Sequence, residues 1–349
     1  MEQKLTKRVR LSTLAYSFLA ALILVFTLTL VCTYFFPRTS SLVETLVRKV
    51  PYPAVVIDYR KSVSFRELSQ NMDSVKRFYE NQDFSKLGLR VDFSTEEGKK
   101  RLKIREKEVL NKMIEDQAMV ILAQKRDIFV TMEMAHQGVT RKIQEYGSEE
   151  RVKTDLDRLY GWGIADFEKK IVLPSLYEEK LKESFLKEVE PAKLAQQKIE
   201  KAAETLRGGA SFNDVVKQYS DGKTVETDGD LGWFSLADLA SELRAPVALQ
   251  KVGTPGNVIE SNLGFHIVLV EELKAEKGGQ LYRLRQIFSR KETFADWLLE
   301  KMQSMSFIVL APEYIFDKST GRIEFKDVVW RTFEEELYKQ ASGDPSLLY

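Results

Sequence analysis

The sequence GGASFNDVVKQYSDGKTVETDGDLGWFSLADLASELRAPVALQKVGTPGNVIESNLGFHIVLV, residues 208–270, decides the fold of the second half of the chain. A short amphipathic helical pattern ends at the turn Tyr-Ser-Asp-Gly, residues 219–222. Gly229 and Gly232 then enclose a tight backbone path that a Cβ atom would obstruct. The stretch closes on His266 and an apolar, β-branched run. Short helices and strands in this order predict an α+β fold.

Four segments of this stretch resemble, in order, the parvulin-type peptidyl-prolyl isomerase domain. They are GGASF, YSDG, DGDLGWF and LGFHIV, which begin at residues 208, 219, 228 and 263. The resemblance implies an antiparallel sheet with surrounding helices, over residues 186–288. It also implies the site residues: a proline pocket, a further substrate-binding aromatic residue, and a catalytic histidine in the polar network at the pocket's edge. In that order these are Leu231, Leu239 and Leu243, then Phe265, then His266.

The reaction that this resemblance implies needs no nucleophile. Rotating an X–Pro bond breaks amide resonance, and uncatalysed exchange takes tens of seconds or longer. An apolar cleft that holds the proline ring and removes water from the amide favours the twisted state. We therefore expect no cofactor, and a proline-containing segment of a polypeptide as the substrate.

Three features depart from the family pattern. Leu243 stands where active members usually have a phenylalanine, and Gly222 where a cysteine or aspartate is common. Family members begin with a strand, but only charged helical sequence precedes Ala192. The alternating stretch 281–288 contains Arg-Gln-Ile-Phe, which resembles that opening strand. We therefore hypothesise a circular permutation, in which Gln286 replaces the family's first histidine as a catalytic residue. The alternative is that 281–288 simply bridges to the next helix.

The chain starts with a basic segment, residues 1–10, followed by an uncharged apolar run, residues 11–36. As a helix the run would be about 39 Å long, against about 30 Å for a hydrocarbon core. The rival interpretation is a cleaved signal peptide, but the run is long for one and no small-residue cleavage site follows it. We expect a single-pass bacterial membrane protein with a cytoplasmic N-terminus. From a tether at residues 37–50 onward, the chain would be extracytoplasmic.

Residues 51–185 show apolar faces at helical spacing and a charged outer side, and we expect an all-α domain there. The segments 109–131 and 161–181 resemble the N-terminal helical domain of SurA-like and PrsA-like exported chaperones. That resemblance implies binding of unfolded or partly folded exported polypeptides through apolar grooves. We expect residues 289–310 to fold back onto this domain. Residues 311–349 form a C-terminal tail to which no function is assigned.

Composition excludes several other classes of function. The formal net charge is +1, so the chain has no general attraction for nucleic acid. One cysteine and two histidines rule out a disulfide within the chain and make a Cys/His metal site unexpected.

Two functions from different classes remain open. The first is a membrane-anchored folding factor with peptidyl-prolyl cis-trans isomerase activity. The second is a parvulin-like module that has lost catalysis and only binds or scaffolds peptides. Gln286 favours the second, because a glutamine can hydrogen-bond but cannot titrate near neutral pH. Gly222 and Leu243 favour it too. A purely structural anchored protein is a third possibility.

Overall fold

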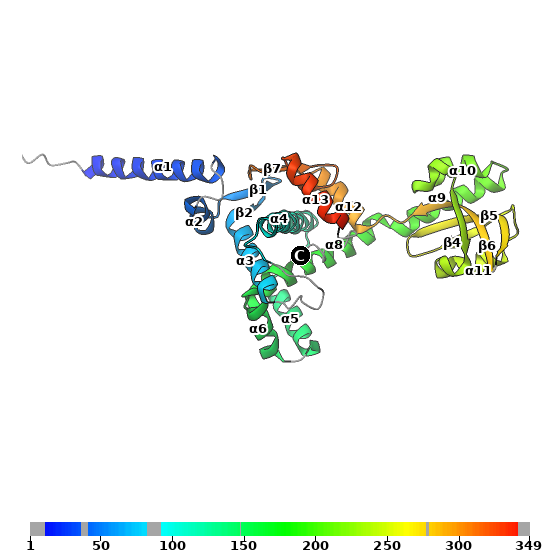
Figure 1. Ribbon diagram of the computed structural model, residues 1–349, viewed down its shortest axis with the longest axis horizontal. Helices are drawn as coiled ribbons and strands as arrows, with labels where there is room; N and C mark the ends of the chain where they lie inside the picture. Colours follow the sequence, from blue (N-terminus) through cyan, green and yellow to red (C-terminus); the bar gives the residue numbers. More distant parts are fainter. Residues whose placement is uncertain (1–10, 36–40, 82–91, 147, 277–278, 341–349) are drawn as a thin grey trace, which may run out of the picture. The chain divides into compact units, whose positions relative to one another are not determined.

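The computed structural model describes residues 11–35, 41–81, 92–146, 148–276 and 279–340. The expected basic end, residues 1–10, lies outside the described residues, as do residues 341–349 of the expected tail. The chain forms two compact units (Figure 1). The helical unit comprises residues 1–181 and 299–349, and the sheet unit comprises residues 182–298.

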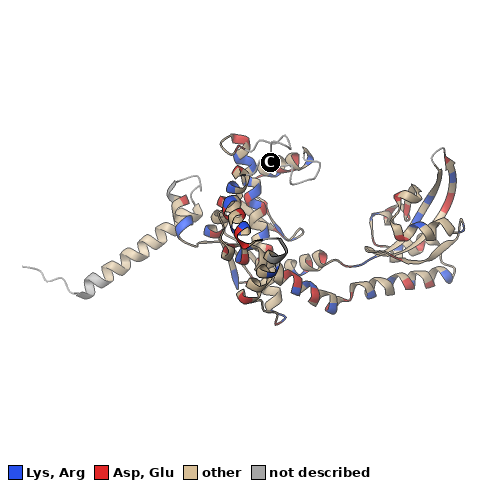
Figure 2. Cartoon of the chain, turned by 90° about the horizontal axis from the view of Figure 1, so that it is seen from below, with Lys and Arg blue, Asp and Glu red and all other residues tan. Residues whose placement is uncertain are grey.

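Helix α1 (Leu11–Phe35) carries no charged residue (Figure 2). Within the described ranges it is the one helix that is long and apolar enough to cross a membrane, over Tyr16–Phe35. A signal sequence near the N-terminus meets the same criterion. The end of α1 contacts the folded chain, because the Tyr34 hydroxyl donates to the Pro53 carbonyl at 2.9 Å.

The segment expected to be a tether is helical from Ser41 to Lys49 (α2). Val43 and Val47, one helical turn apart, are both buried. Arg48 pairs with Asp73 of the next helix at 2.6 Å. This part of the expected tether therefore packs on the helical unit, because its apolar face has a partner there.

Helix α4 (Glu96–Gln124) runs through the core of the helical unit. Thr95 begins it by accepting a hydrogen bond from the Gly98 amide at 2.9 Å. Ile104, Leu110 and Ile114 lie on its buried face. The chain between residues 65 and 189 also forms α3 (Phe65–Asn81), α5 (Met132–Tyr146), α6 (Glu149–Tyr160), α7 (Ile164–Phe167), the π-helix Glu168–Val172 and α8 (Leu173–Val189).

We expected an all-α domain over residues 51–185, but this part of the chain also contains the strands β1 (Pro53–Ile57) and β2 (Lys61–Ser64). The three-stranded antiparallel sheet has the order β2, β1, β7 (Phe307–Val309). The apolar run around Val55 is buried between the other two strands. Since β7 pairs with β1, the chain returns from the sheet unit to the N-terminal part of the helical unit.

The segment that follows β7 is folded as far as Gln340. It forms the hairpin of β8 (Tyr314–Asp317) and β9 (Arg322–Phe325), and then α13 (Val328–Gln340). Lys107 of α4, itself buried, contacts Glu324 at 2.5 Å and Glu334 at 2.6 Å. Asn111 exchanges two hydrogen bonds with the backbone of Ile323. The described part of the expected tail therefore packs in the helical unit.

The sheet unit is a four-stranded antiparallel sheet with the order β3-β6-β5-β4. Its strands are β3 (Asp230–Ser235), β4 (Pro255–Glu260), β5 (Gly264–Glu276) and β6 (Gly279–Arg290). Helices α9 (Pro191–Arg207) and α10 (Phe212–Tyr219) pack on one face. The other face carries α11 (Ser241–Leu249), while α12 (Phe294–Gln303) follows the sheet. Residues 281–288 thus occupy a central strand, as predicted.

Candidate functional site

The alternation of strand β5 separates its side chains between the two faces of the sheet. Phe265, Ile267 and Leu269 pack in the cluster formed with helices α9 and α10. Val268 and Val270 pack in the opposite cluster. His266, one residue away from Phe265, therefore points to the face that carries Val268.

His266 meets Gln286 on that face. In the antiparallel register His266 lies opposite Phe288, and Val268 lies opposite Gln286. His266 and Gln286 are thus diagonal neighbours, and their Nδ1 and Oε1 atoms are 3.1 Å apart. The His266 ring stacks on Phe288, with centroids 4.6 Å apart. The two predicted catalytic residues are side by side because β6 lies next to β5.

Ser261 fixes the other edge of the imidazole. Its Oγ lies 2.8 Å from Nε2 of His266, and it also accepts the amide hydrogens of Leu263 and Gly264. The Gln286 oxygen accepts from Nδ1–H, which leaves Nε2 to accept from the serine hydroxyl. This arrangement suits a neutral imidazole, with one proton on Nδ1.

The surroundings of His266 favour that neutral form. Burial lowers the pKa of His266 below its usual value, against the smaller opposing effects of the Gln286 hydrogen bond and the negative charge of Glu242. The imidazole is 7% exposed. At neutral pH the polar edge of this face is therefore uncharged, and it can offer hydrogen bonds to an amide without a proton-transfer step.

The three predicted pocket leucines share one cluster on the same face. Leu239 is buried, and Leu231 and Leu243 pack against the cluster from its border. The cluster also contains Val268, the residue opposite Gln286. The structure therefore brings the leucines and the His266–Gln286 pair to a common side of the sheet. Apolar side chains next to uncharged hydrogen-bonding groups suit a proline ring and its neighbouring carbonyl.

Phe265 does not belong to this group, contrary to our expectation of a substrate-binding role. Its side chain is 5% exposed and packs with Ile199, Phe212 and Ile287 in the α9/α10 cluster. The reason is the period of two in a strand, which turns neighbouring residues to opposite faces.

Gly222 has a conformation that only glycine adopts readily, with φ 133° and ψ 170°. A Cβ there would have room, since the nearest atom is Cδ1 of Phe288 at 3.9 Å. The turn is held to β6, because the Asp221 amide donates to the Phe288 carbonyl at 2.6 Å. The backbone conformation therefore favours glycine at this position, although there is room for a side chain.

Sequence reasoning missed Ser261 and Phe288. The signal for Ser261 was the sequence Ser-Asn-Leu-Gly before the strand, in which a serine side chain at a tight turn accepts backbone amides. The signal for Phe288 was its place two residues after Gln286 in an alternating strand.

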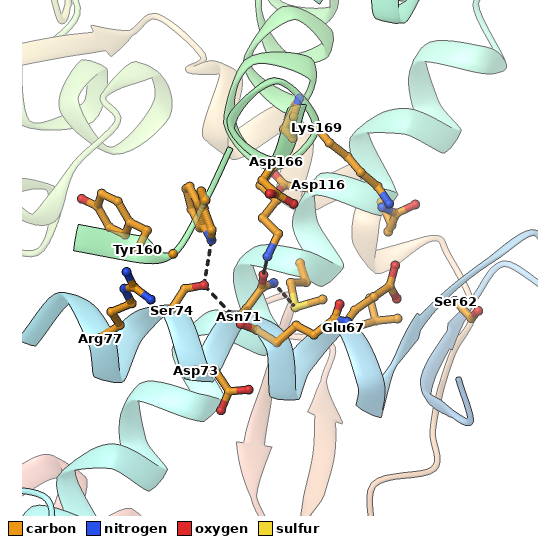
Figure 3. Close-up of a pocket in the computed structure, with 18 residues that line it drawn as sticks. Ser62, Glu67, Asn71, Asp73, Ser74, Arg77, Asp116, Tyr160, Asp166 and Lys169 are labelled. Carbon is orange, nitrogen blue, oxygen red and sulfur yellow. Dashed lines mark hydrogen bonds between the residues drawn. The ribbon is translucent and has the colours of Figure 1, made fainter. Parts of the chain in front are cut away.

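A second cleft lies in the helical unit, where α3 faces α4 and the segment around Trp162 (Figure 3). Its cavity is about 520 Å³, and it joins an apolar extension of about 350 Å³. Tyr160 stacks between Phe78 and Trp162, at centroid distances of 5.2 and 4.8 Å. The Trp162 indole donates to Ser74 Oγ at 2.7 Å.

Lys170 is a half-buried cation in the lining of this cleft. The Lys170 ammonium donates to Asn71 Oδ1 at 2.8 Å and lies 5.1 Å from the centre of the Trp162 ring. Burial lowers its pKa, an effect larger than those of the neighbouring charges. Carboxylates such as Asp116 also line the cleft, so the cleft combines an aromatic wall with mixed charges. No group of three Asp, Glu, His or Cys residues that could hold a metal occurs in the part of the chain that the structure describes.

The sequence of the sheet unit is similar to that of a known protein family. Residues 180–272 match the family model "Rotamase: PPIC-type PPIASE domain". The sheet unit thus carries a parvulin-type domain. The matched residues include His266 and the three leucines but end before β6, so the match does not reach Gln286.

Curated relatives cover only part of the chain. "Chaperone SurA" of Bordetella parapertussis is 31% identical over 121 residues, which are 33% of this chain and 23% of that protein. "Chaperone SurA" of Nitrosococcus oceani is 33% identical over 109 residues, 30% of this chain and 26% of that one. The matched part spans about a quarter of the length of these relatives. A crystal structure of the peptidylprolyl isomerase PrsA from Bacillus anthracis aligns with 68% of this chain and 98% of its own, at 17% identity and a TM-score of 0.22.

Proposed function

We propose that this chain, which carries a PPIC-type peptidyl-prolyl isomerase domain, is a membrane-anchored folding factor that acts on polypeptides outside the cytoplasm. The sheet unit would catalyse cis-trans isomerisation of X–Pro bonds, and the helical unit would hold unfolded segments. The observation that carries the proposal is the common face of His266, Gln286 and the leucine cluster. His266 and the three predicted pocket leucines lie within the stretch that matches the isomerase family.

In this mechanism the chain provides a shaped, dry environment. The leucine cluster around Leu239 holds the proline ring and excludes water, which favours the less polar, twisted amide. The Gln286 oxygen keeps the proton of the neutral imidazole on Nδ1, and Ser261 holds the Nε2 edge of the ring. The amide group of Gln286, fixed in this way, would orient the substrate amide by hydrogen bonds. Every bond made to the substrate is non-covalent, so no nucleophile is needed.

Helix α1 and the relatives support the proposed location. An apolar N-terminal helix and similarity to proteins named "Chaperone SurA" are compatible with an envelope-associated protein. We propose that α1 stays uncleaved, with residues 1–10 in the cytoplasm. The contact of Tyr34 with Pro53 would then place the helical unit next to the membrane surface. The aromatic cleft around Trp162 is the candidate for holding client segments.

The decisive experiment is a proline-isomerisation assay on the full chain in detergent. We expect acceleration for a tetrapeptide with a central proline, and a loss of about tenfold or more in His266→Ala. Leu249→Ala is the control, since Leu249 is 87% exposed and outside the leucine cluster. No acceleration by the wild-type chain, with retained suppression of client aggregation, would favour the inactive peptide-binding module instead. Absence of both would leave a purely structural role.

A further inference from the structure

The sheet unit contains a cavity that is lined in part by Phe288. Its volume is about 720 Å³, larger than either part of the cleft in the helical unit. Its walls come from the end of α8, the start of α9, the β4–β5 turn and the segment after β6. The apolar lining residues are Phe185, Leu186, Pro191, Ala192, Leu263, Phe288 and Phe294.

Phe288 connects this cavity with the candidate isomerase site. One side of its ring stacks on His266, and a Cβ at Gly222 would lie 3.9 Å from its Cδ1 atom. The same residue lines the cavity. Leu263, which also lines the cavity, follows Ser261 in the turn that holds the imidazole. A chain bound with its proline on the leucine cluster therefore needs only a short extension to reach the cavity, since an extended chain advances about 3.3 Å per residue.

Two leucines make the cavity attractive to an apolar side chain. Leu186 is 60% exposed and Leu263 is 72% exposed, so both leave apolar surface in water at its rim. Most of the charged groups at the rim that could oppose this are paired inside the unit: Glu190 with Lys193, Lys291 with Glu260, and Arg290 with Asp296. A bound apolar group would therefore gain burial, and these charged side chains would keep their partners.

From these contacts we propose that the cavity is a specificity subsite, which binds a large apolar side chain of the client a few residues from the isomerised proline. This inference rests on the proposed function, because it assigns the flanking sequence of the same substrate. The occupant is one client chain in extended form, with the proline on the leucine cluster and a leucine-like side chain beyond Phe288.

The test uses a set of short peptides with a central proline and otherwise alanine, each carrying one leucine at a different flanking position. With the full chain in detergent, we expect at least one position at which leucine lowers KM and Kd about fivefold to tenfold relative to the all-alanine peptide. Leu186→Ala and Ala192→Trp should each bring this ratio close to one, by removing a wall or by filling the space. The all-alanine peptide should keep its kcat/KM in both variants.

The control is Leu194→Ala. Leu194 is 55% exposed and lies on α9 close to Ala192, but it does not line the cavity. It should keep the full leucine preference. An unchanged preference in both Leu186→Ala and Ala192→Trp would overturn the subsite, as would a wild-type chain with no leucine preference at any position. Kd values from peptide fluorescence anisotropy decide this point even without turnover, whereas absence of turnover counts only against the isomerase activity.

Discussion

Nδ1 of His266 lies 3.1 Å from Oε1 of Gln286, although the two residues come from different strands. The pair forms because β6 inserts between β3 and β5 and sets Gln286 diagonally across from His266. An amide partner differs from a second imidazole, since it accepts a hydrogen bond at every pH of interest. Of the two residues in the pair, only His266 can therefore change its ionisation near neutral pH.

Removing that acceptor should destabilise the sheet unit. Gln286→Met leaves the buried Nδ1–H of His266 without its partner, which costs about 1–3 kcal/mol. Isomerase activity should fall as well, because the imidazole loses its fixed orientation. Urea unfolding followed by the near-UV signal measures the first effect. Gln280→Met, on an exposed position of the same strand, should change neither quantity.

Gly229 and Gly232 have nearly the same positive φ but differ in the space around them. Comparing their alanine variants therefore separates the cost of steric crowding from the cost of backbone strain. Gly229 and Gly232 have φ values of 85° and 83°. A Cβ at Gly229 would lie 2.5 Å from the Gln286 carbonyl oxygen, whereas nothing lies within 4 Å of one at Gly232. Gly232→Ala should cost about 1–2 kcal/mol from its positive φ alone. Gly229→Ala should cost about 2 kcal/mol more, because β3 must move away from β6. Equal losses in the two variants would contradict the close approach.

The buried lysine of α4 should be a strong determinant of the helical unit's stability. Lys107→Met leaves Glu324 and Glu334 close together without their cation. Burial already raises the pKa of Glu334, against the lowering effect of Lys107. We expect a loss of about 3 kcal/mol or more in the free energy of unfolding. Lys99→Met, which breaks an exposed pair with Glu96 on the same helix, should cost less than about 0.5 kcal/mol.

The two histidines should respond to pH in opposite directions. Burial lowers the pKa of His266 in the folded chain, so only the unfolded chain takes up a proton just below pH about 6.5. Its contribution to stability is therefore full above that pH and is lost as the pH falls towards the lowered pKa. The hydrogen bond and charge of Glu168 raise the pKa of His136. Its contribution is full below pH about 6.5 and is lost as the pH rises through the raised pKa.

Hydrogen exchange between pH 5 and 8 checks these signs in each unit separately. His266→Gln should flatten the pH dependence of protection in β5. His136→Gln should affect only α5 and the π-helix, and weakly, because the His136 side chain is 63% exposed. The same sign of slope at both sites would disprove the assignment.

Local sequence patterns were sufficient for much of the sheet unit. The helix capped by Ser211, the Gly229–Gly232 block and the strand after His266 appear where their turn residues and periodicity place them. The alternation of 281–288 also sufficed to place Gln286 in the sheet, since a period of two marks a strand with two different faces. The prediction placed Phe265 with His266, whereas the same period of two turns these neighbours to opposite faces of the sheet.

Contacts between residues far apart in the chain could not be predicted from local sequence patterns. Lys107 and Glu334 are brought together by the fold of distant segments, and neither residue alone differs from an ordinary surface charge. The strand pairing of β1 with β7 depends in the same way on the path of the whole chain. Helix α2 was missed because nine residues with two buried valines give a weak periodic signal.

The chain leaves the helical unit at Leu181 and re-enters it at Leu299, so the sheet unit is an insertion. A ribosome releases the N-terminal part first, yet β1 cannot acquire its partner β7, nor Lys107 its two carboxylates, until the last strands and α13 have emerged. The sheet unit has all four strands as soon as Arg290 is available. During synthesis, the insertion can therefore be complete while the helical unit still exposes unpaired strand edges and Lys107 still lacks its two carboxylate partners.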